Sequence, residues 1–422
     1  MRKNIMFFTL LVVVIWAGLV QAYDFKGIDL QGETITVVSW HDVLKDIERD
    51  YPGRIAEAEE KFNCKLEYVG IHWDDYAEGL MNRLLAGDSV YDFWKVNHNF
   101  FWELFSQKAF YPVSEIVPAA YYPTLPPPHQ SIIDNLSYQG VRYGFSSYGS
   151  LLGSMRFVAW NKDMFEREGL PDLYELYRTG QWTWDQALEI AKKTTRDTDG
   201  DGNNDQWGWS TVWSFDLGFS NDARLTKEIN GQRVFTYDQQ PALEALASYY
   251  QWQYIDKVVL SGDWGGDNFK AGTVAMQPLE FWRIEFMNKD FNFDFGIVPM
   301  PKGPSASRYG YPHVSMETMV LPANSRAAKE IVAVADFLFQ AEDYYYGLEK
   351  SIAKNVPDRT AVEVVKEGMK SWDGEILMFG AALPDEWSDA FRSIMDGEKT
   401  PAAAMAEIKG KVQVNLDQLF DQ

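Results

Sequence analysis

Three short stretches near the middle of the chain decide its fold. Residues 160–165 read Trp-Asn-Lys-Asp-Met-Phe, residues 183–188 read Thr-Trp-Asp-Gln-Ala-Leu, and residues 197–208 read Asp-Thr-Asp-Gly-Asp-Gly-Asn-Asn-Asp-Gln-Trp-Gly. In the second stretch, Thr183 and Gln186 have the spacing of a capping box, which predicts that a helix begins there. The third stretch has the charge spacing of a loop wrapped around a hard cation.

The candidate metal ligands follow one another through this loop: Asp197, Asp199, Asp201, Asn203 and Asp205. Gly202 falls where a calcium loop turns sharply, and Asn203 would offer its backbone carbonyl. Gly208 stands where such a loop usually carries a bidentate glutamate. We expect a structural calcium ion because carboxylates this crowded repel one another. The alternative is a solvated turn between a helix and a strand, and no organic cofactor is expected.

The N-terminus has the layout of a secretory signal peptide. Basic residues precede an apolar run from Ile5 to Val20, and a small residue, Ala22, precedes the expected cleavage point. The run is shorter than the ~20 residues that span a bilayer as a helix. We therefore expect residues 1–22 to be removed and the protein to be exported to the periplasm. The next residue is Tyr23 rather than a cysteine, so no lipid anchor is expected.

Composition excludes several classes of partner. The formal net charge of −22 over 422 residues repels nucleic acid and anionic membrane surfaces. The single cysteine, Cys64, cannot form an intrachain disulfide. The chain carries 16 tryptophans, and aromatic residues make up 15% of it, which indicates flat surfaces available to a ligand. We expect a monomer that binds no nucleic acid.

The first part of the chain alternates strands and helices. Strands are expected at residues 33–39, 65–69 and 90–96, and helices at residues 52–62 and 74–85. This order predicts a parallel sheet with helices on both faces, which is an α/β architecture.

Later segments indicate a second lobe and a return to the first. The prolines at 126–128 predict irregular structure, and Pro241 is expected to open a helix. Residues 293–299 are expected to form the strand that crosses back, and Pro401 to begin the last helix. The predicted organisation is a signal peptide at 1–22, a first lobe at 23–143 plus 294–355, and a second lobe at 144–293 plus 356–422. Lobes built from discontinuous segments are joined by several crossings, which act as a hinge.

The chain carries no local signature of catalysis. There is no HExxH motif, phosphate loop or dinucleotide-binding glycine pattern, and the five histidines are scattered. A glycosidase remains an alternative, because two catalytic carboxylates distant in sequence leave no local motif. We do not expect an enzyme.

The three opening stretches, in their order, resemble the family 1 extracellular solute-binding proteins. Two later patterns strengthen the resemblance: Phe269, Gly272, Ala275 and Met276 followed by Trp282, and Pro299, Pro301 and Gly303 at alternate positions. The resemblance implies an α/β, two-lobed periplasmic-binding-protein fold of type II-like topology, with discontinuous lobes joined by hinge crossings. It also implies a sugar held in the cleft between the lobes and delivery to the permease subunits of an ABC transporter.

The resemblance also implies ligand-binding residues. It implies that Trp94 stacks on the sugar while Asn97 and His98 bind hydroxyls, and that Trp282 is a cleft tryptophan. The complete set of candidate ligand-binding residues is Trp40, His41, Trp94, Asn97, His98, Tyr148, Trp213, Phe215, Trp264, Trp282, His313 and Trp387. Trp40 and His41 enter this set because they follow the first strand, where such sheets place ligands. The alternative for every aromatic residue is core packing.

The expected function is therefore reversible capture of a carbohydrate, which we expect to be an oligosaccharide, and no bond of it is expected to be broken. Two alternatives remain open at this level. One is a secreted enzyme that acts on glycans, and the other is a sensory sugar-binding protein that presents its ligand to a receptor.

Overall fold

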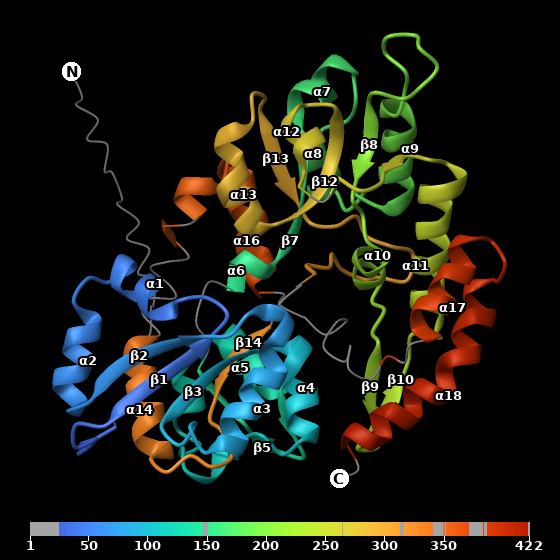
Figure 1. Cartoon of the computed structure of the whole chain (residues 1–422). Coiled ribbons are helices and arrows are strands. Elements are labelled where there is room, and N and C mark those ends of the chain that lie inside the picture. The colour runs from blue at the N-terminus through green and yellow to red at the C-terminus, as the bar shows by residue number, and fades with distance from the viewer. Residues whose placement is uncertain are drawn as a thin grey trace, which may run out of the picture.

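Two lobes, each built around a five-stranded sheet, make up the protein (Figure 1). The computed structural model describes residues 25–146, 151–263, 265–312, 316–340, 349–350, 352–370, 383 and 386–420. The strand order is β2-β1-β3-β14-β6 in the first lobe and β11-β8-β12-β7-β13 in the second. This confirms the predicted two-lobed α/β fold.

The first sheet combines the parallel strands of the N-terminal segment with one strand from far along the chain. Its strands are β1 (Thr34–Ser39), β2 (Lys65–Gly70), β3 (Asp92–Asn97), β6 (Gly144–Ser146) and β14 (Glu317–Val320). Strand β1 pairs in parallel with β2 and β3, whereas β14 is antiparallel to both β3 and β6. Figure 1 shows β14 in orange among the blue strands of this lobe. The first lobe is therefore completed only when the chain returns from the second.

Helices cover both faces of the first sheet. They are α1 (Val43–Asp50), α2 (Arg54–Phe62), α3 (Tyr76–Ala86), α4 (His98–Ser106), α5 (Pro127–Asn135) and α14 (Ala328–Leu338). Phe93 joins the core beneath α1, α2 and α14, whereas its neighbour Trp94 joins the core beneath α3 and α4. Every residue of β3 is buried, because successive side chains of a strand covered on both faces all enter a core.

The second sheet has mixed strand directions. Its strands are β7 (Arg156–Asn161), β8 (Trp207–Ser210), β11 (Val259–Leu260), β12 (Val274–Glu280) and β13 (Phe295–Val298). Strands β11, β8 and β12 are parallel, β7 is antiparallel to β12, and β13 is antiparallel to β7. The helices of this lobe are α6 (Leu151–Ser154), α7 (Lys162–Arg167), α8 (Leu173–Arg178), α9 (Trp184–Thr194), α10 (Ser214–Ser220), α11 (Gln240–Tyr250), α12 (Asp267–Lys270), α13 (Phe281–Met287) and α16 (Arg359–Lys370).

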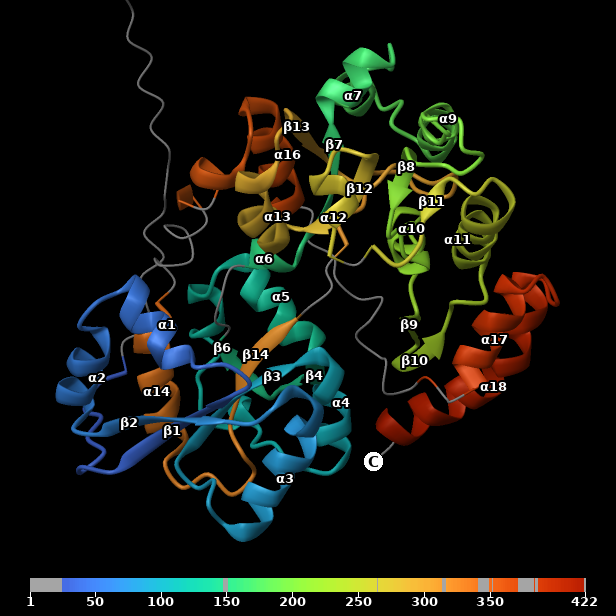
Figure 2. The same cartoon turned by 45° about the horizontal axis from the view of Figure 1, so that its top comes forward.

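The C-terminal helices pack against a hairpin of the second lobe and also reach the first. Helices α17 (Glu386–Met395) and α18 (Pro401–Phe420) lie beside the hairpin of β9 (Thr226–Ile229) and β10 (Gln232–Phe235), as Figure 2 shows. At the end of α18, the ring of Phe420 lies 4.8 Å from the ring of Trp102, between ring centroids. Among the described residues, no helix has both the length and the apolar character needed to cross a bilayer.

Two short crossings hold the edges of the two sheets close together. The amide of Arg156, at the start of β7, donates to the carbonyl of Pro312 at 2.8 Å. The amide of His98, just after β3, donates to the carbonyl of Met316 at 2.8 Å. Pro312 and Met316 are four residues apart, so their Cα atoms are separated by at most about 14 Å. The second crossing joins Ser146 to Leu151, which are five residues apart in the sequence.

The predicted lobe boundaries need correction at two strands. Strand β13 was expected to lie in the first lobe, but it pairs with β7, with Phe295 opposite Asn161, and so belongs to the second sheet. Strand β6 was expected in the second lobe, but it pairs with β14 in the first sheet. The chain therefore crosses after residue 146 and returns after residue 298, because hydrogen-bond pairing with the neighbouring strand decides the lobe.

One predicted helix is confirmed at both ends, and one other expectation is wrong. Helix α9 spans Trp184–Thr194, and its cap residue Thr183 accepts a hydrogen bond from the amide of Gln186 at 3.5 Å. The expectation of irregular structure around the prolines at 126–128 is wrong, because α5 begins at Pro127. A proline in the first turn of a helix removes an amide that has no intrahelical partner, so it does not prevent the helix.

Gly208 is fixed by packing rather than by metal binding. A Cβ atom at Gly208 would lie 2.5 Å from the Cα of Ala191, in the backbone of α9. Helix α9 and strand β8 therefore approach so closely at this point that no side chain fits. This explains why the position that carries glutamate in many calcium loops is glycine here.

We predict that Gly208→Ala lowers the free energy of unfolding by about 1–3 kcal/mol, because the helix backbone must move away from the new methyl group. Gly410→Ala is the matched control: Gly410 lies inside α18 with no atom within 4 Å of its added Cβ. The control should gain roughly 0.5–1 kcal/mol from helix propensity. Urea denaturation followed by fluorescence measures both values, and equal stability of the two variants would contradict the packing argument.

The buried His98 makes the free energy of unfolding depend on pH. Its Nδ1 accepts a hydrogen bond from the amide of Met316 at 3.1 Å, and burial lowers the pKa of His98 to about 4. In the unfolded chain the imidazole titrates near pH 6.5. Since the folded pKa is the lower one, its contribution to stability is present above pH 6.5 and is lost as the pH falls toward 4.

We predict that His98→Asn makes the free energy of unfolding less dependent on pH between 6.5 and 4, by about 3 kcal/mol over that window. The asparagine oxygen keeps an acceptor for Met316 but does not titrate. The control is His72→Asn, since His72 is exposed and its Nδ1 also accepts a backbone amide, that of Asp74 at 3.4 Å. Denaturation curves at several pH values should show the control following the parent protein, and an unchanged slope for His98→Asn would refute this role.

Candidate functional site

The facing edges of the two sheets form the candidate functional site. The parallel strands of the first lobe end at this edge, since β3 ends at Asn97 next to the crossing contact of His98 with Met316. In the second lobe, β12 ends at Glu280 opposite the start of β7 at Arg156, which contacts the other end of the same crossing. Ligands of open α/β sheets bind outside the carboxyl ends of the strands. Both lobes therefore offer such an edge to the same space.

The edge of the first lobe carries a group of aromatic rings. The ring of Trp40, which follows β1, lies 5.1 Å from that of Trp73 and 5.2 Å from that of Tyr76, with both pairs close to perpendicular. Trp73 in turn lies 4.7 Å from Phe100, between ring centroids. Trp73 is 37% exposed, so one indole of this group reaches solvent. Sequence reasoning missed Trp73, although it follows the end of β2 as Trp40 follows the end of β1.

An ion pair with a buried ammonium lies beside these rings. The Nζ of Lys95 is 2.7 Å from the Oε2 of Glu317, and it is 4.8 Å from the centroid of the Trp40 ring. The side chain of Lys95 is only 5% exposed, whereas that of Glu317 is 24% exposed. The carboxylate is therefore the more accessible member of the pair. Sequence reasoning missed both residues, because they are far apart in the chain and meet only through the pairing of β3 with β14.

His41 lies next to the same charges. Its Nε2 is 3.6 Å from the Oδ2 of Asp46, and its ring lies 5.8 Å from that of Trp40. Burial lowers the pKa of His41, and the ammonium of Lys95 lowers it further. A neutral imidazole at this edge can donate and accept a hydrogen bond without adding a positive charge.

The edge of the second lobe holds a guanidinium between two carboxylates. The Nε of the buried Arg156 is 3.3 Å from the Oδ1 of Asp216, and its Nη1 is 3.8 Å from the Oε1 of Glu280. Its Cζ lies 3.9 Å from the centroid of the Trp213 ring. Burial raises the pKa of Asp216 to about 6, although Arg156 acts in the opposite direction. Trp213 thus lies at this edge with one face of its ring covered by Arg156.

Trp282 presents the most exposed indole among the predicted ligand contacts that the structure describes. It lies on α13 directly after β12 and is 42% exposed. The Cζ of Arg283 is 4.7 Å from the centroid of its ring, and the Nε of Arg283 is 2.6 Å from the Oε2 of Glu280. A Cβ atom at Gly153 in the crossing helix α6 would lie 3.7 Å from the Cβ of Trp282. This contact places Trp282 at the junction of the lobes.

Three predicted ligand contacts have structural roles instead. Trp94 is 0% exposed, and its Nε1 donates to Asp92 at 3.3 Å, so its ring is not available for stacking on a ligand. Asn97 caps α4 by accepting a hydrogen bond from the amide of Asn99 at 3.0 Å. His98 is buried at the crossing, as described above. The interpretation of residues 93–98 is wrong because the strand is covered by helices on both faces.

The remaining predicted aromatic residues fall into two groups. Phe215 and Trp387 are stacked on each other, with ring centroids 6.3 Å apart and an interplanar angle of 5°. This stack joins α10 to α17 and lies against Tyr237, which indicates packing between helices. Tyr148, Trp264 and His313 lie outside the described residues.

The acidic loop brings three of its predicted ligands together. Carboxylate oxygens of Asp197, Asp199 and Asp205 lie within 4.8 Å of one another. Both oxygens of Asp197 accept backbone amides of the loop, including that of Gly202 at 2.7 Å, and these hydrogen bonds lower the pKa of Asp197. Asp201 is not part of this group of three, and its Oδ1 accepts the amide of Asn203 at 2.7 Å.

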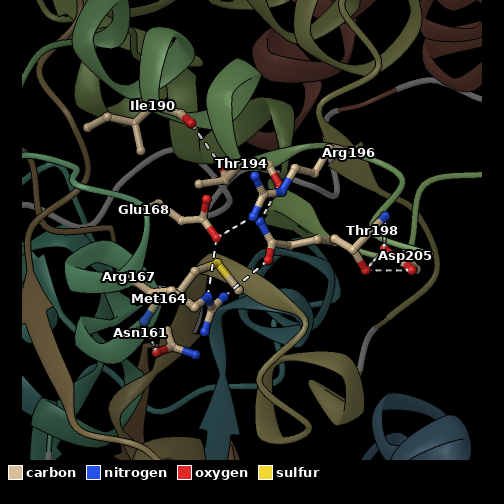
Figure 3. A network of polar contacts seen from close by, with 10 residues as sticks. Asn161, Met164, Arg167, Glu168, Ile190, Thr194, Arg196, Thr198 and Asp205 are labelled. Carbon is tan, nitrogen blue, oxygen red and sulfur yellow. Dashed lines mark hydrogen bonds and ion pairs between the residues drawn. The ribbon is translucent and has the colours of Figure 1, made fainter. Parts of the chain in front are cut away.

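The base of the loop is tied to the rest of the second lobe (Figure 3). The Nη2 of Arg196 lies 2.5 Å from the Oε1 of Glu168, and the side chain of Gln206 donates to the carbonyl of Thr194 at 3.0 Å. Within the loop, the hydroxyl and the amide of Thr198 donate to Asp205. The carboxylates are thus held on a fixed base far from the sheet edges described above, on the opposite end of β8 from Trp213.

Comparison with solved structures shows the same fold in several sugar-binding proteins. The ABC substrate-binding protein Lmo0181 from Listeria monocytogenes, in complex with cycloalternan, is 18% identical, with a TM-score of 0.67 over 92% of this chain and 98% of that one. The maltose/maltodextrin-binding domain MalE from Bdellovibrio bacteriovorus, bound to maltotriose, is 14% identical, with a TM-score of 0.64 over 92% of this chain and 100% of that one.

The same fold also holds a different kind of ligand. UgpB from Mycobacterium tuberculosis, in complex with glycerophosphocholine, is 15% identical, with a TM-score of 0.66 over 91% of this chain and 98% of that one. Comparison with curated protein sequences finds no match. The family model described as bacterial extracellular solute-binding protein matches residues 46–345. The chain belongs to this family of solute-binding proteins.

Proposed function

We propose that the protein binds a carbohydrate reversibly between its lobes and serves as the solute-binding component of an ABC importer. The observation that carries the proposal is that each facing edge combines an exposed indole with a carboxylate. These are Trp73 and Glu317 in the first lobe, and Trp282 and Glu280 in the second. An indole covers the apolar C–H face of a sugar ring, and carboxylates accept hydrogen bonds from its hydroxyls. An oligosaccharide offers several such faces.

The crossings support a closing movement of the lobes. Two segments of a few residues connect the sheets near Ser146 and near Pro312, and such segments absorb the backbone rotations of a hinge. A ligand held by both edges favours the closed form, because it has contacts there that the open form lacks. The permease subunits of the importer would recognise that closed form.

Family membership and the ligands of similar structures support the proposal. The facing edges of this chain add the indoles and carboxylates that would contact a sugar. The solved neighbours include proteins in complex with cycloalternan and with maltotriose.

We further propose that residues 1–22 act as a cleavable signal peptide, without a lipid anchor, and that the mature protein acts in the periplasm as a monomer. A glycan-cleaving enzyme and a sensory sugar receptor remain weaker alternatives, since no observation on the described residues favours either.

We also propose that the loop of residues 197–205 holds a structural calcium ion. The three convergent carboxylates of Asp197, Asp199 and Asp205 supply the hard oxygen ligands that calcium prefers. Gly202, with a φ of 93°, provides the sharp turn between them. The ion would offset the repulsion among carboxylates within 4.8 Å of one another and stabilise the loop rather than take part in ligand binding.

We predict that Trp282→Ala weakens binding of the best oligosaccharide roughly 10- to 100-fold, because an indole face of this size contributes about 1.5–3 kcal/mol when it is covered. Its stability should change little, since the side chain is partly exposed. The control is Trp94→Phe, which should lower the melting temperature and leave affinity unchanged because Trp94 is buried.

Titration calorimetry over a panel of malto-, cello-, xylo- and manno-oligosaccharides measures these affinities. Recovery of unchanged sugar after long incubation separates binding from hydrolysis, and any appearing product would favour the enzyme alternative. If Trp282→Ala binds as tightly as the parent protein, the ligand does not lie on this edge.

We predict that calcium at millimolar concentration raises the melting temperature relative to chelator, and that Asp199→Asn abolishes this difference by removing one charged ligand. The control is Asp88→Asn, an exposed aspartate outside the loop, which should respond to calcium as the parent protein does. Differential scanning calorimetry with and without EDTA makes the measurement, and identical melting of the parent protein in both buffers would exclude the ion.

A further inference from the structure

Every cation that the structure places at the two facing edges is already paired with a carboxylate. The three cations are Lys95 in the first lobe and Arg156 and Arg283 in the second. Their partners are Glu317, Asp216 and Glu280. The charges at these edges therefore balance, although each lobe supplies them from different elements of its fold.

In the first lobe, the pairing of Lys95 leaves its ammonium covered. The Nζ is 2.7 Å from the Oε2 of Glu317 and lies over the Trp40 ring, so little of the side chain reaches solvent. The other oxygen of Glu317 is 3.4 Å from the Nδ2 of Asn97. A ligand that approaches this edge meets the more exposed carboxylate before the ammonium. A buried ammonium also needs its partner, since an unpaired charge there is costly.

In the second lobe, Glu280 is shared by two guanidinium groups. Its Oε2 is 2.6 Å from the Nε of Arg283, and its Oε1 is 3.8 Å from the Nη1 of Arg156. Asp216 lies 3.3 Å from the Nε of Arg156, and the Nη2 of Arg156 donates to the carbonyl of Pro278 at 3.1 Å. The Nε and Nη1 of Arg156 therefore contact carboxylates as ion pairs without a hydrogen bond. Arg283, which lies over the exposed Trp282 ring, would be the natural partner of an acidic ligand, but its Nε is already bonded to Glu280.

The sequence limits the further positive charge that His41 and the undescribed stretches can supply. Burial and Lys95 lower the pKa of His41, so its ring is neutral at neutral pH. The stretches that the structure leaves undescribed between residues 147 and 385 contain no lysine or arginine in their sequence. Lys370, at the end of α16, is the one cation there whose side chain is not described. The overall charge of −22 also disfavours binding of acidic ligands, because it repels anions.

We infer that the site selects uncharged saccharides, and that Glu317 and Glu280 are the residues that exclude acidic ones such as uronates and sulfated or phosphorylated sugars. This inference rests on the proposed carbohydrate function. A neutral hydroxyl can donate to either carboxylate without disturbing its ion pair. A ligand carboxylate would instead lie close to Glu317 or Glu280, and these carboxylates repel it while their charges already neutralise Lys95 and Arg283.

The test compares neutral and acidic ligands of the same length on the full-length mature protein. The probes are malto-, cello-, manno- and galacto-oligosaccharides on one side and oligoglucuronates, oligomannuronates and oligogalacturonates on the other, measured by calorimetry at low salt. The parent protein should bind at least one neutral series and bind each acidic counterpart at least about tenfold more weakly, because a charged hydrogen bond is lost.

Two isosteric variants should bind acidic oligosaccharides more tightly than the parent protein does. Glu317→Gln removes the negative charge beside Lys95, and Glu280→Gln removes the one beside Arg283. Each variant should therefore bind an acidic oligosaccharide roughly 10- to 100-fold more tightly than the parent protein does. The gain should shrink as salt rises. Glu103→Gln, at an exposed position of α4, is the matched control and should show no gain.

A double variant, Lys95→Met with Glu317→Gln, keeps the inference testable if the single change destabilises the first lobe. It removes both charges, so it should fold without an unpaired ammonium and should not gain acidic ligands. The inference is overturned if the parent protein binds acidic and neutral counterparts equally, or if both folded single variants gain nothing. If the parent protein binds no saccharide of either series, the proposed carbohydrate function itself is wrong, and the inference with it.

Discussion

The backbone contacts at the ends of one short crossing constrain everything else at the site. Arg156 donates to Pro312, and His98 donates to Met316 only four residues later. The first bond belongs to the edge of the second sheet and the second to the edge of the first. The chain between them reaches at most about 14 Å, so the two edges cannot separate widely at this point. The ends of β3 and β12, which lie beside these two contacts, are therefore close to each other although they are far apart in sequence.

The two lobes place the same kinds of side chain at the facing edges, but they do so from different secondary-structure elements. In the first lobe, the indole of Trp40 follows β1, while Lys95 and Glu317 come from the paired strands β3 and β14. In the second lobe, Trp282 and Arg283 are neighbours on α13, beside Glu280. Each set combines an indole, a cation near its ring and a carboxylate that neutralises the cation. Since each ion pair lies within one lobe, the charges move with that lobe, and closure neither forms nor breaks these pairs.

Local patterns in the sequence predict local structure well here, and non-local pairing explains what they miss. The capping residues around Thr183 place the start of α9 correctly, and the glycine and aspartate spacing of residues 197–205 predicts a turn with convergent carboxylates. Trp94 shows the limit, because a strand covered on both faces buries both of its side-chain rows, and its sequence resembles that of a strand with one open face. The pairing of Lys95 with Glu317 depends on a strand that joins the first sheet after the chain has built the second, and no local pattern reports it.

The C-terminal helix sets the direction in which the lobes can move. Phe420, at the end of α18, packs against Trp102 and Tyr138 of the first lobe, while the rest of α18 packs against the hairpin and α17 of the second. Opening the molecule on this side would expose the Phe420 ring, which costs about 1.5–3 kcal/mol for a large apolar side chain. Opening at the facing edges exposes indoles that already reach solvent and separates no ion pair between Lys95, Arg156 or Arg283 and its partner. The lower cost at the edges favours a hinge that opens there and keeps the C-terminal contact closed, so that a ligand enters where the indoles and carboxylates are.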